Sequence, residues 1–160
     1  MDNPHRVVIG IGSNLDDPLA QVRHGITALA RLGTTEAVSS LYRSAPWGRI
    51  GQPTFVNAAV RLATFHSPQI LLRELKKLER ELGRATVSRW GPRRIDFDIL
   101  IFDDLEINEP DLIVPHQHLY VRAFALVPLA EIDPRFLPAV DRLDATELSG
   151  LTFLARANSV

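Results

Sequence analysis

The chain has 160 residues, of which 46% are hydrophobic and 23% charged, and its formal net charge is -1. This length usually means one domain of ordinary globular composition, and the absence of cysteine excludes disulfides, thiolate nucleophiles and cysteine-ligated zinc. No apolar run approaches the ~18 residues of a membrane span, and the polar start from Met1 to Arg6 is unlike a signal peptide. We therefore expect a single cytoplasmic domain over residues 1–160, with no membrane partner.

The first two thirds of the chain predict four strands and two helices. Residues 6–12 are β-branched and apolar, which indicates a short buried strand. Asp17 and Pro18 mark the start of a helix that we expect to end near Gly33. Further strands are expected over the following ranges: 36–44, 54–64 and 95–102. A second helix begins with Ser67 and Pro68 and ends at Gly83.

The order βαββαβ predicts an α+β, ferredoxin-like sandwich, in which helices pack mainly on one face of an antiparallel sheet. Beyond Phe102 the pattern is weaker, with a short hairpin strand expected at 105–107 and a loop at 108–118. Residues 120–132 are apolar enough for a helix, which Pro128 is expected to interrupt. A mixed tail with a helix near 145–154 completes a C-terminal extension.

The sharpest chemical signal is a pair of aspartates at the start of the fourth predicted strand. Residues two apart on a strand face the same side, with Cα atoms ~7 Å apart, so Asp96 and Asp98 share a face that Leu100 and Phe102 continue. The opposite face is expected to be apolar: Ile95, Phe97, Ile99 and Ile101. Two neighbouring carboxylates repel each other unless a cation lies between them, and oxygen ligands suit Mg²⁺. Taken alone, the pair is also compatible with a solvated acidic strand end.

An arginine cluster directly upstream favours phosphate chemistry. Within a dozen residues before the acids lie four arginines: Arg84, Arg89, Arg93 and Arg94. Metal ions neutralise bridging phosphate oxygens, and guanidinium groups hold the remaining charge. Trp90 either stacks on a base or an arginine or anchors the loop. The combination predicts magnesium-dependent phosphoryl-group transfer from a nucleotide.

Other nucleotide and metal motifs are absent or weak. The chain contains no GxxxxGK[ST] phosphate-binding loop, and Gly10-Ile11-Gly12 lacks the third glycine of a dinucleotide fingerprint, so it indicates only a tight turn. His116 and His118 lie two residues apart, but His116 after Pro115 fits a phosphate contact better than a metal ligand.

The segment RWGPRRIDFDIL at 89–100 closely resembles the hydroxymethyl-dihydropterin pyrophosphokinase family of folate biosynthesis. That family's hallmark is RWGPR, two residues, then D-x-D. The resemblance continues in the same order over most of the chain, from the first strand to Ile132. Its further matches include GSNL at 12–15, YRS at 42–44, Phe55 with Asn57, VPH at 114–116, and Arg122 with Phe124.

The resemblance implies transfer of a pyrophosphoryl group from ATP to the hydroxymethyl oxygen of 6-hydroxymethyl-7,8-dihydropterin, with release of AMP. Asp96 and Asp98 would bind two Mg²⁺ ions, while Arg84 and Arg93 would hold the phosphates and the developing charge. The same resemblance implies these residues around ATP: Glu79, Trp90, Ile99, His116 and Arg122. Both substrates are small molecules, so we expect no nucleic-acid partner, and we expect a monomer.

For the pterin, the resemblance implies a flat slot between Phe55 and Phe124, with Asn57 at the ring edge. Backbone groups near Ser44 and Trp47 are expected to contribute. Core packing is the alternative for the slot residues. An asparagine within an apolar strand is costly without a partner, which favours the ligand.

One departure from the family pattern and two other functions stay open. Thr86 stands where the family often has a second arginine, and Arg89 or Arg94 are candidates to replace it. One other function is a nucleic-acid-binding ferredoxin-like module, although the first strand offers no aromatic side chain for base stacking. The other is a metal-dependent phosphohydrolase, which needs the acid pair but no flat-ring slot.

Overall fold

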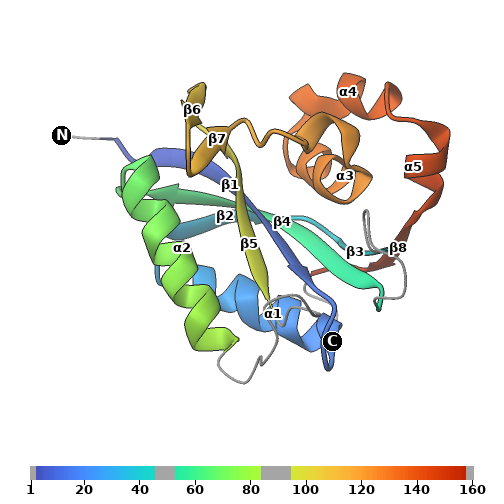
Figure 1. Cartoon of the computed structure of the whole chain (residues 1–160), viewed down its shortest axis with the longest axis horizontal. Helices are drawn as coiled ribbons and strands as arrows, with labels where there is room; N and C mark the ends of the chain where they lie inside the picture. Colours follow the sequence, from blue (N-terminus) through green and yellow to red (C-terminus); the bar gives the residue numbers. More distant parts are fainter. Residues whose placement is uncertain (1–2, 46–52, 84–94, 158–160) are drawn as a thin grey trace.

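The computed structural model of the chain describes residues 3–45, 53–83 and 95–157 (Figure 1). Its main sheet has the strand order β5-β1-β4-β3-β8, and β2 pairs with another part of β4. The strands of this sheet are β1 (His5–Ser13), β2 (Thr34–Val38), β3 (Leu41–Ser44), β4 (Phe55–Thr64), β5 (Asp96–Phe102) and β8 (Leu151–Ala155). The helices are α1 (Pro18–Leu29), α2 (Pro68–Leu82), α3 (Ala123–Ile132), α4 (Leu137–Asp141) and α5 (Ala145–Ser149).

The predicted ferredoxin-like α+β fold with a C-terminal extension is confirmed. Helices α1 and α2 cover one face of the sheet, and α3 with the C-terminal elements covers the other (Figure 1). Val7, Ile9 and Ile11 of β1 point into the core on the α1/α2 side. Val8 points instead into the second core, beside Leu126 of α3. Strand β1 is therefore buried on both faces.

Local capping explains where α2 begins and ends. The Ser67 hydroxyl accepts a hydrogen bond from the Ile70 N–H, Pro68 takes the first helical position, and Gly83 closes the helix. One helical stripe is buried: Leu71, Leu75 and Leu78. Helix α1 begins at Pro18 as predicted but ends at Leu29, four residues before Gly33.

Gly33 is required by a close backbone approach. A Cβ placed there would lie 2.3 Å from the Ala63 carbonyl oxygen of β4. We expect Gly33→Ala to lower the free energy of unfolding by about 1–3 kcal/mol, because the strand backbone has to move. Gly150→Ala is the matched control, since its nearest neighbour would be at 3.5 Å, and we expect a change within about 0.5 kcal/mol. Urea unfolding measures both, and equal effects would contradict the close approach as the cause.

The predicted strand at 36–44 is two strands, β2 and β3, separated by Ser39 and Ser40. Both pair with β4, at different parts of its length. The Ser39 hydroxyl accepts a hydrogen bond from the Ala59 N–H at 2.8 Å, as a strand carbonyl would. A side chain thus substitutes for the backbone ladder at the break.

The predicted alternation along β5 holds at first and then fails. Between Val8 and Ile9 the β1–β5 register shifts, so that Ile9 faces Ile99 whereas Val8 faces Ile101. Leu100 is the extra residue, and a bulge of this kind reverses the alternation after it. Ile101 therefore joins the α3-side core and Phe102 the opposite core, contrary to the sequence prediction.

Three predictions beyond β5 are wrong. The hairpin strand expected at 105–107 starts only at Ile107, as β6 (Ile107–Glu109), and the residues expected to form a loop contain the rest of β6 and its partner β7 (Leu112–Val114). Pro128 does not interrupt α3, which is buried along most of its length and gains enough from packing to tolerate one lost hydrogen bond. The helix predicted at 145–154 stops at Ser149, and the chain then pairs with β3 as β8.

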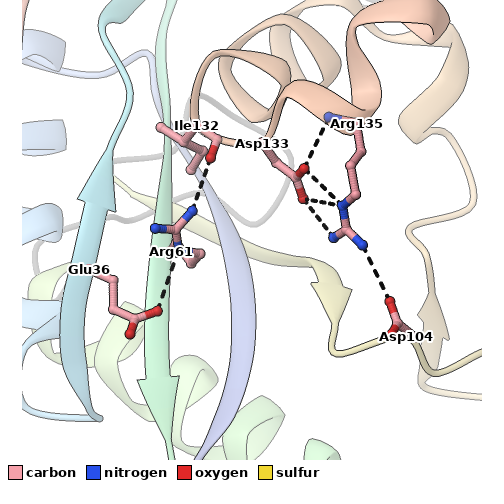
Figure 2. A network of polar contacts seen from close by, with 6 residues as sticks. All are labelled: Glu36, Arg61, Asp104, Ile132, Asp133 and Arg135. Carbon is pink, nitrogen blue, oxygen red and sulfur yellow. Dashed lines mark hydrogen bonds and ion pairs between the residues drawn. The ribbon is translucent and has the colours of Figure 1, made fainter.

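Polar contacts tie the C-terminal end of α3 to the sheet (Figure 2). Arg61 of β4 donates a hydrogen bond to the Ile132 carbonyl at 3.0 Å and pairs with Glu36 of β2 at 3.4 Å. Beyond the helix, Arg135 binds the Asp133 carboxylate and reaches Asp104 after β5 at 3.5 Å. Among the helices in the described parts of the chain, none is both long and apolar enough to cross a membrane.

Candidate active site

A cavity of about 190 Å³ lies between the sheet and the first turn of α3. Four strands and α3 supply its walls, which include these residues: Gly10, Gly12, Ser44, Phe55, Asn57, Asp96, Asp98, Leu100, Arg122, Phe124 and Ala125. Seven residues assigned to the site from the sequence are thus brought together: Ser44, Phe55, Asn57, Asp96, Asp98, Arg122 and Phe124.

Asp96, Gly12 and Asn57 form one row across three adjacent strands. Gly12 is the register partner of Asp96 on β5 and of Asn57 on β4. Neighbouring strands are ~4.8 Å apart, so the acid and the amide backbones lie about 10 Å from each other with no side chain between them. The row therefore leaves space above Gly12, between a carboxylate and an amide.

Gly10 and Gly12 were wrongly interpreted as a tight turn, because both lie within β1. A Cβ on Gly12 would approach the Asn57 Oδ1 to 3.3 Å, and one on Gly10 would approach the Leu100 side chain to 3.2 Å. Their missing side chains open the cavity beside Asp96 and Asp98. Two glycines two residues apart in a strand pattern indicate such a close approach.

Glu79, near the C-terminal end of α2, lies beside the start of β5. Its carboxylate accepts a hydrogen bond from the Phe97 N–H at 2.7 Å, and its side chain is 14% exposed. Burial and the neighbouring charge of Asp96 raise the pKa of Glu79 to about 7, although the Phe97 N–H and Lys76 act in the opposite direction. Two ionised carboxylates this close repel each other, and a cation bound between them would relieve that repulsion.

The raised pKa predicts how metal-free stability depends on pH. Ionising Glu79 costs more in the folded than in the unfolded protein, so its contribution to stability is fully present below pH 4.5 and falls as pH rises towards 7. In EDTA we expect Glu79→Gln to be about 1–3 kcal/mol more stable than wild type at pH 8 and equal to it at pH 4. Urea unfolding across pH tests this, with Glu74→Gln on the same helix as control. Parallel curves for wild type and Glu79→Gln would refute it.

His116 faces the aspartate pair from the segment after β7. Its backbone N–H donates to the Leu100 carbonyl, and its Nδ1 accepts from the His118 N–H, so the ring proton is assigned to Nε2. That Nε2 lies 4.0 Å from the Asp98 Oδ1. Burial and the charges of Arg122 and His118 lower the pKa of His116, which makes the ring a neutral donor at pH 7.

Arg122 brings a positive charge to the same cavity. Burial lowers the pKa of its guanidinium, whereas the charges of Asp98 and Glu147 act in the opposite direction. The guanidinium carbon lies 5.5 Å from the ring centre of Phe124, two residues later in the chain. Arg122 and the two carboxylates therefore line one end of the cavity, and the neutral imidazole of His116 lies beside Asp98.

The other end of the cavity is lined by aromatic and amide groups. Asn57 is 3% exposed, and its Nδ2 donates a hydrogen bond to the buried Ser44 hydroxyl at 2.7 Å. The amide keeps one N–H and the Oδ1 for another partner. Phe55 and Phe124 are half-buried at the walls. Such a set suits a flat, polar-edged heterocycle.

Glu79 and His116 lie next to the aspartates without lining the cavity, and the other predicted site residues are not brought to it by the described structure. Ile99 is 4% exposed and packs in the core under α1 and α2. The following residues lie outside the described ranges: Trp47, Arg84, Thr86, Arg89, Trp90, Arg93 and Arg94.

A pair of carboxylates suits Mg²⁺ better than it suits a metal ion whose ligands all come from the protein. The described residues contain no group of three or more histidine, cysteine or acidic side chains that could hold a metal ion. Mg²⁺ is usually bound through one or two carboxylates, with phosphate oxygens and water as its other ligands. Asp96 and Asp98 match that pattern, and they lie next to Glu79, the carboxyl group with the raised pKa.

Comparisons with known proteins show the family of this chain. Residues 8–134 match the family model of 7,8-dihydro-6-hydroxymethylpterin-pyrophosphokinase. A 2-amino-4-hydroxy-6-hydroxymethyldihydropteridine pyrophosphokinase of Pseudomonas aeruginosa is 45% identical over 131 residues, 81% of each chain. The Haemophilus influenzae protein of the same name is 41% identical over 126 residues, 78% of this chain and 79% of that one.

The fold is also similar to that of a solved structure. A crystal structure of Plasmodium falciparum HPPK-DHPS matches with a TM-score of 0.69 and 16% identity, over 83% of this chain. The match spans 43% of that longer chain, and at 16% identity it bears on the fold alone. On the family match and the two bacterial relatives, the chain belongs to the 7,8-dihydro-6-hydroxymethylpterin-pyrophosphokinase family.

Proposed function

We propose that Asp96 and Asp98 are the metal-binding carboxylates with which this chain performs the reaction of its family. As a family member the chain is a pyrophosphokinase of folate biosynthesis, which transfers pyrophosphate from ATP to the hydroxymethyl group of 6-hydroxymethyl-7,8-dihydropterin. The row of Asp96, Gly12 and Asn57 under α3 carries the proposal, because it sets an acid and a ring-edge amide about two strand spacings apart.

The carboxylate end of the cavity is proposed to take the polyphosphate. Two bound Mg²⁺ ions would neutralise the phosphate oxygens and polarise the transferring group, with Asp96 and Asp98 as their protein ligands. Arg122 supplies a permanent positive charge there, and the Nε2–H of neutral His116 donates to a phosphate oxygen. Glu79, Trp90, Arg84 and Arg93 keep the ATP or phosphate roles implied by the resemblance, whereas the Ile99 side chain packs in the core under α1 and α2.

The amide end is proposed to take the pterin. Phe55 and Phe124 stack on the two sides of the ring, and Asn57, oriented by Ser44, pairs with its edge. Held in this way, the hydroxymethyl oxygen would point towards the acid pair. There it would attack the β-phosphorus of ATP while the bond from that phosphorus to the α-phosphate oxygen breaks, so that AMP leaves and the hydroxyl proton passes to solvent. The chemistry then depends on positioning and charge, and no covalent enzyme intermediate is needed.

A three-component assay tests the proposal. Protein, ATP, Mg²⁺ and the pterin alcohol are mixed, and AMP is measured with each component left out in turn. We expect AMP only when all are present, and none in EDTA. Phosphate release without pterin would indicate a phosphohydrolase, and tight RNA binding without Mg²⁺ would indicate a nucleic-acid module. The proposal takes the protein as a cytoplasmic monomer, and light scattering during size-exclusion chromatography tests the monomer.

A further inference from the structure

The first turn of α3 carries side chains from both ends of the cavity. Arg122 immediately precedes the helix, and Phe124 and Ala125 lie in its first turn. The first N–H groups of a helix have no partner within the helix, and an arginine at the cap position offers no acceptor oxygen. The Ala123 N–H therefore needs an acceptor from elsewhere in the chain.

Glu147 of α5 supplies that acceptor. Its Oε1 accepts a hydrogen bond from the Ala123 N–H at 3.0 Å, and Ala123 is 1% exposed, so the N–H would be buried without it. A carboxylate at a helix N-terminus is also favoured by the helix dipole. The same carboxylate attracts the Arg122 guanidinium. One side chain from the tail thus holds the start of α3 and a cation of the cavity.

We propose that Glu147 is a positioning residue for both substrates, which fixes the first turn of α3 so that Phe124 faces the pterin and Arg122 faces the phosphates. The inference rests on the proposed function. Glu147 lies after residue 134, where the match to the family model ends.

The tail that carries Glu147 is itself well anchored. Asp144 caps α5 by accepting a hydrogen bond from the Thr146 N–H, and Leu148 packs against the α3-side core. The chain continues directly into β8, where Leu151 is the register partner of Ser44. The five residues from Glu147 to Leu151 therefore link the side chain that caps α3 to strand β8, which pairs with the strand that carries Ser44.

The rest of α3 does not depend on Glu147. Near its C-terminal end, Glu131 accepts hydrogen bonds from the Ser40 N–H, the Ser40 hydroxyl and the Tyr42 hydroxyl. Arg61 holds the last carbonyl of the helix, that of Ile132 (Figure 2). Removing the Glu147 carboxylate should therefore loosen the first turn while the helix stays docked.

Kinetics of three variants test the inference. Glu147→Ala removes both interactions, and we expect the KM values for pterin and ATP each to rise about 5–30-fold, the range of a lost helix cap. Glu147→Gln keeps the acceptor oxygen but loses the charge. We therefore expect its KM for pterin to stay within 2-fold of wild type, a difference of ~0.4 kcal/mol or less, whereas its KM for ATP should rise. Asp141→Ala, an exposed acid on α4, is the control and should change neither.

The possible outcomes separate the inference from the proposed function. KM values of Glu147→Ala within 2-fold of wild type would overturn the inference alone, and so would a lower kcat with unchanged KM, which means a loss of folded protein. Wild-type protein that forms no AMP would refute the proposed function and this inference with it. If Glu147→Ala does not fold, Glu147→Gln still tests the inference. A raised KM for ATP with an unchanged KM for pterin would support it, and two unchanged KM values would overturn it.

Discussion

Asp98→Asn is expected to lower kcat by about 10³-fold or more, and Asp96→Asn by a similar factor. Each change removes one of the two carboxylates proposed to hold the cations that stabilise charge on the transferring group, an effect worth several kcal/mol. AMP formation at saturating ATP, pterin and Mg²⁺ measures the loss. Asp111→Asn, on the exposed turn between β6 and β7, is the control and should retain wild-type kcat.

Thermal unfolding of the same variants excludes a trivial cause. Because Asp96 contributes to the raised pKa of Glu79, we expect metal-free Asp96→Asn to be at least as stable as wild type at pH 8. An active Asp98→Asn enzyme with normal magnesium dependence would refute the metal-binding role. Inactivity that accompanies unfolding in both variants would instead make the pair structural.

Asn57→Leu is expected to raise the KM for pterin by about 10²-fold, with kcat at saturation reduced much less. The substitution keeps the branching and the number of non-hydrogen atoms of the side chain but removes the groups that pair with the ring edge. Loss of such buried pairing costs about 1–3 kcal/mol for each group left without a partner. Fluorescence titration with the pterin gives an independent dissociation constant. Asn108→Leu on exposed β6 is the matched control.

Stability distinguishes the ligand role of Asn57 from core packing. Among the described residues, Ser44 is the one hydrogen-bond partner of the Asn57 side chain. A leucine there should therefore leave the free energy of unfolding of the ligand-free protein within about 1 kcal/mol of wild type. A core or hydrogen-bonding role predicts the reverse, with lower stability and an unchanged KM. That result would leave Asn57 outside the substrate site.

Local signals were enough to predict most of the βαββαβ framework. Ser67 and Pro68 start a helix by supplying a cap and a fixed φ, and these effects act within one turn of chain. Alternation along a strand likewise depends only on neighbouring residues, which is why Asp96 and Asp98 were correctly placed on one face.

The errors in the fold arise from long-range pairing. The bulge at Leu100 depends on how β5 meets β1, and the break at Ser39 depends on a hydrogen bond from Ala59, 20 residues away. Residues 151–154 form a strand rather than a helix because the edge of β3 offers backbone partners. Propensity cannot encode such partners when they are distant in the chain.

By itself the sequence determined the family, through RWGPR before the aspartate pair, and with it the reaction class and the chemical types at the site. Only the tertiary structure decided that Gly12 lies between Asp96 and Asn57, and that the tail returns to place Glu147 on α3. The reason is physical: a motif specifies which groups are present, whereas sheet register and helix docking specify which of them share a cavity.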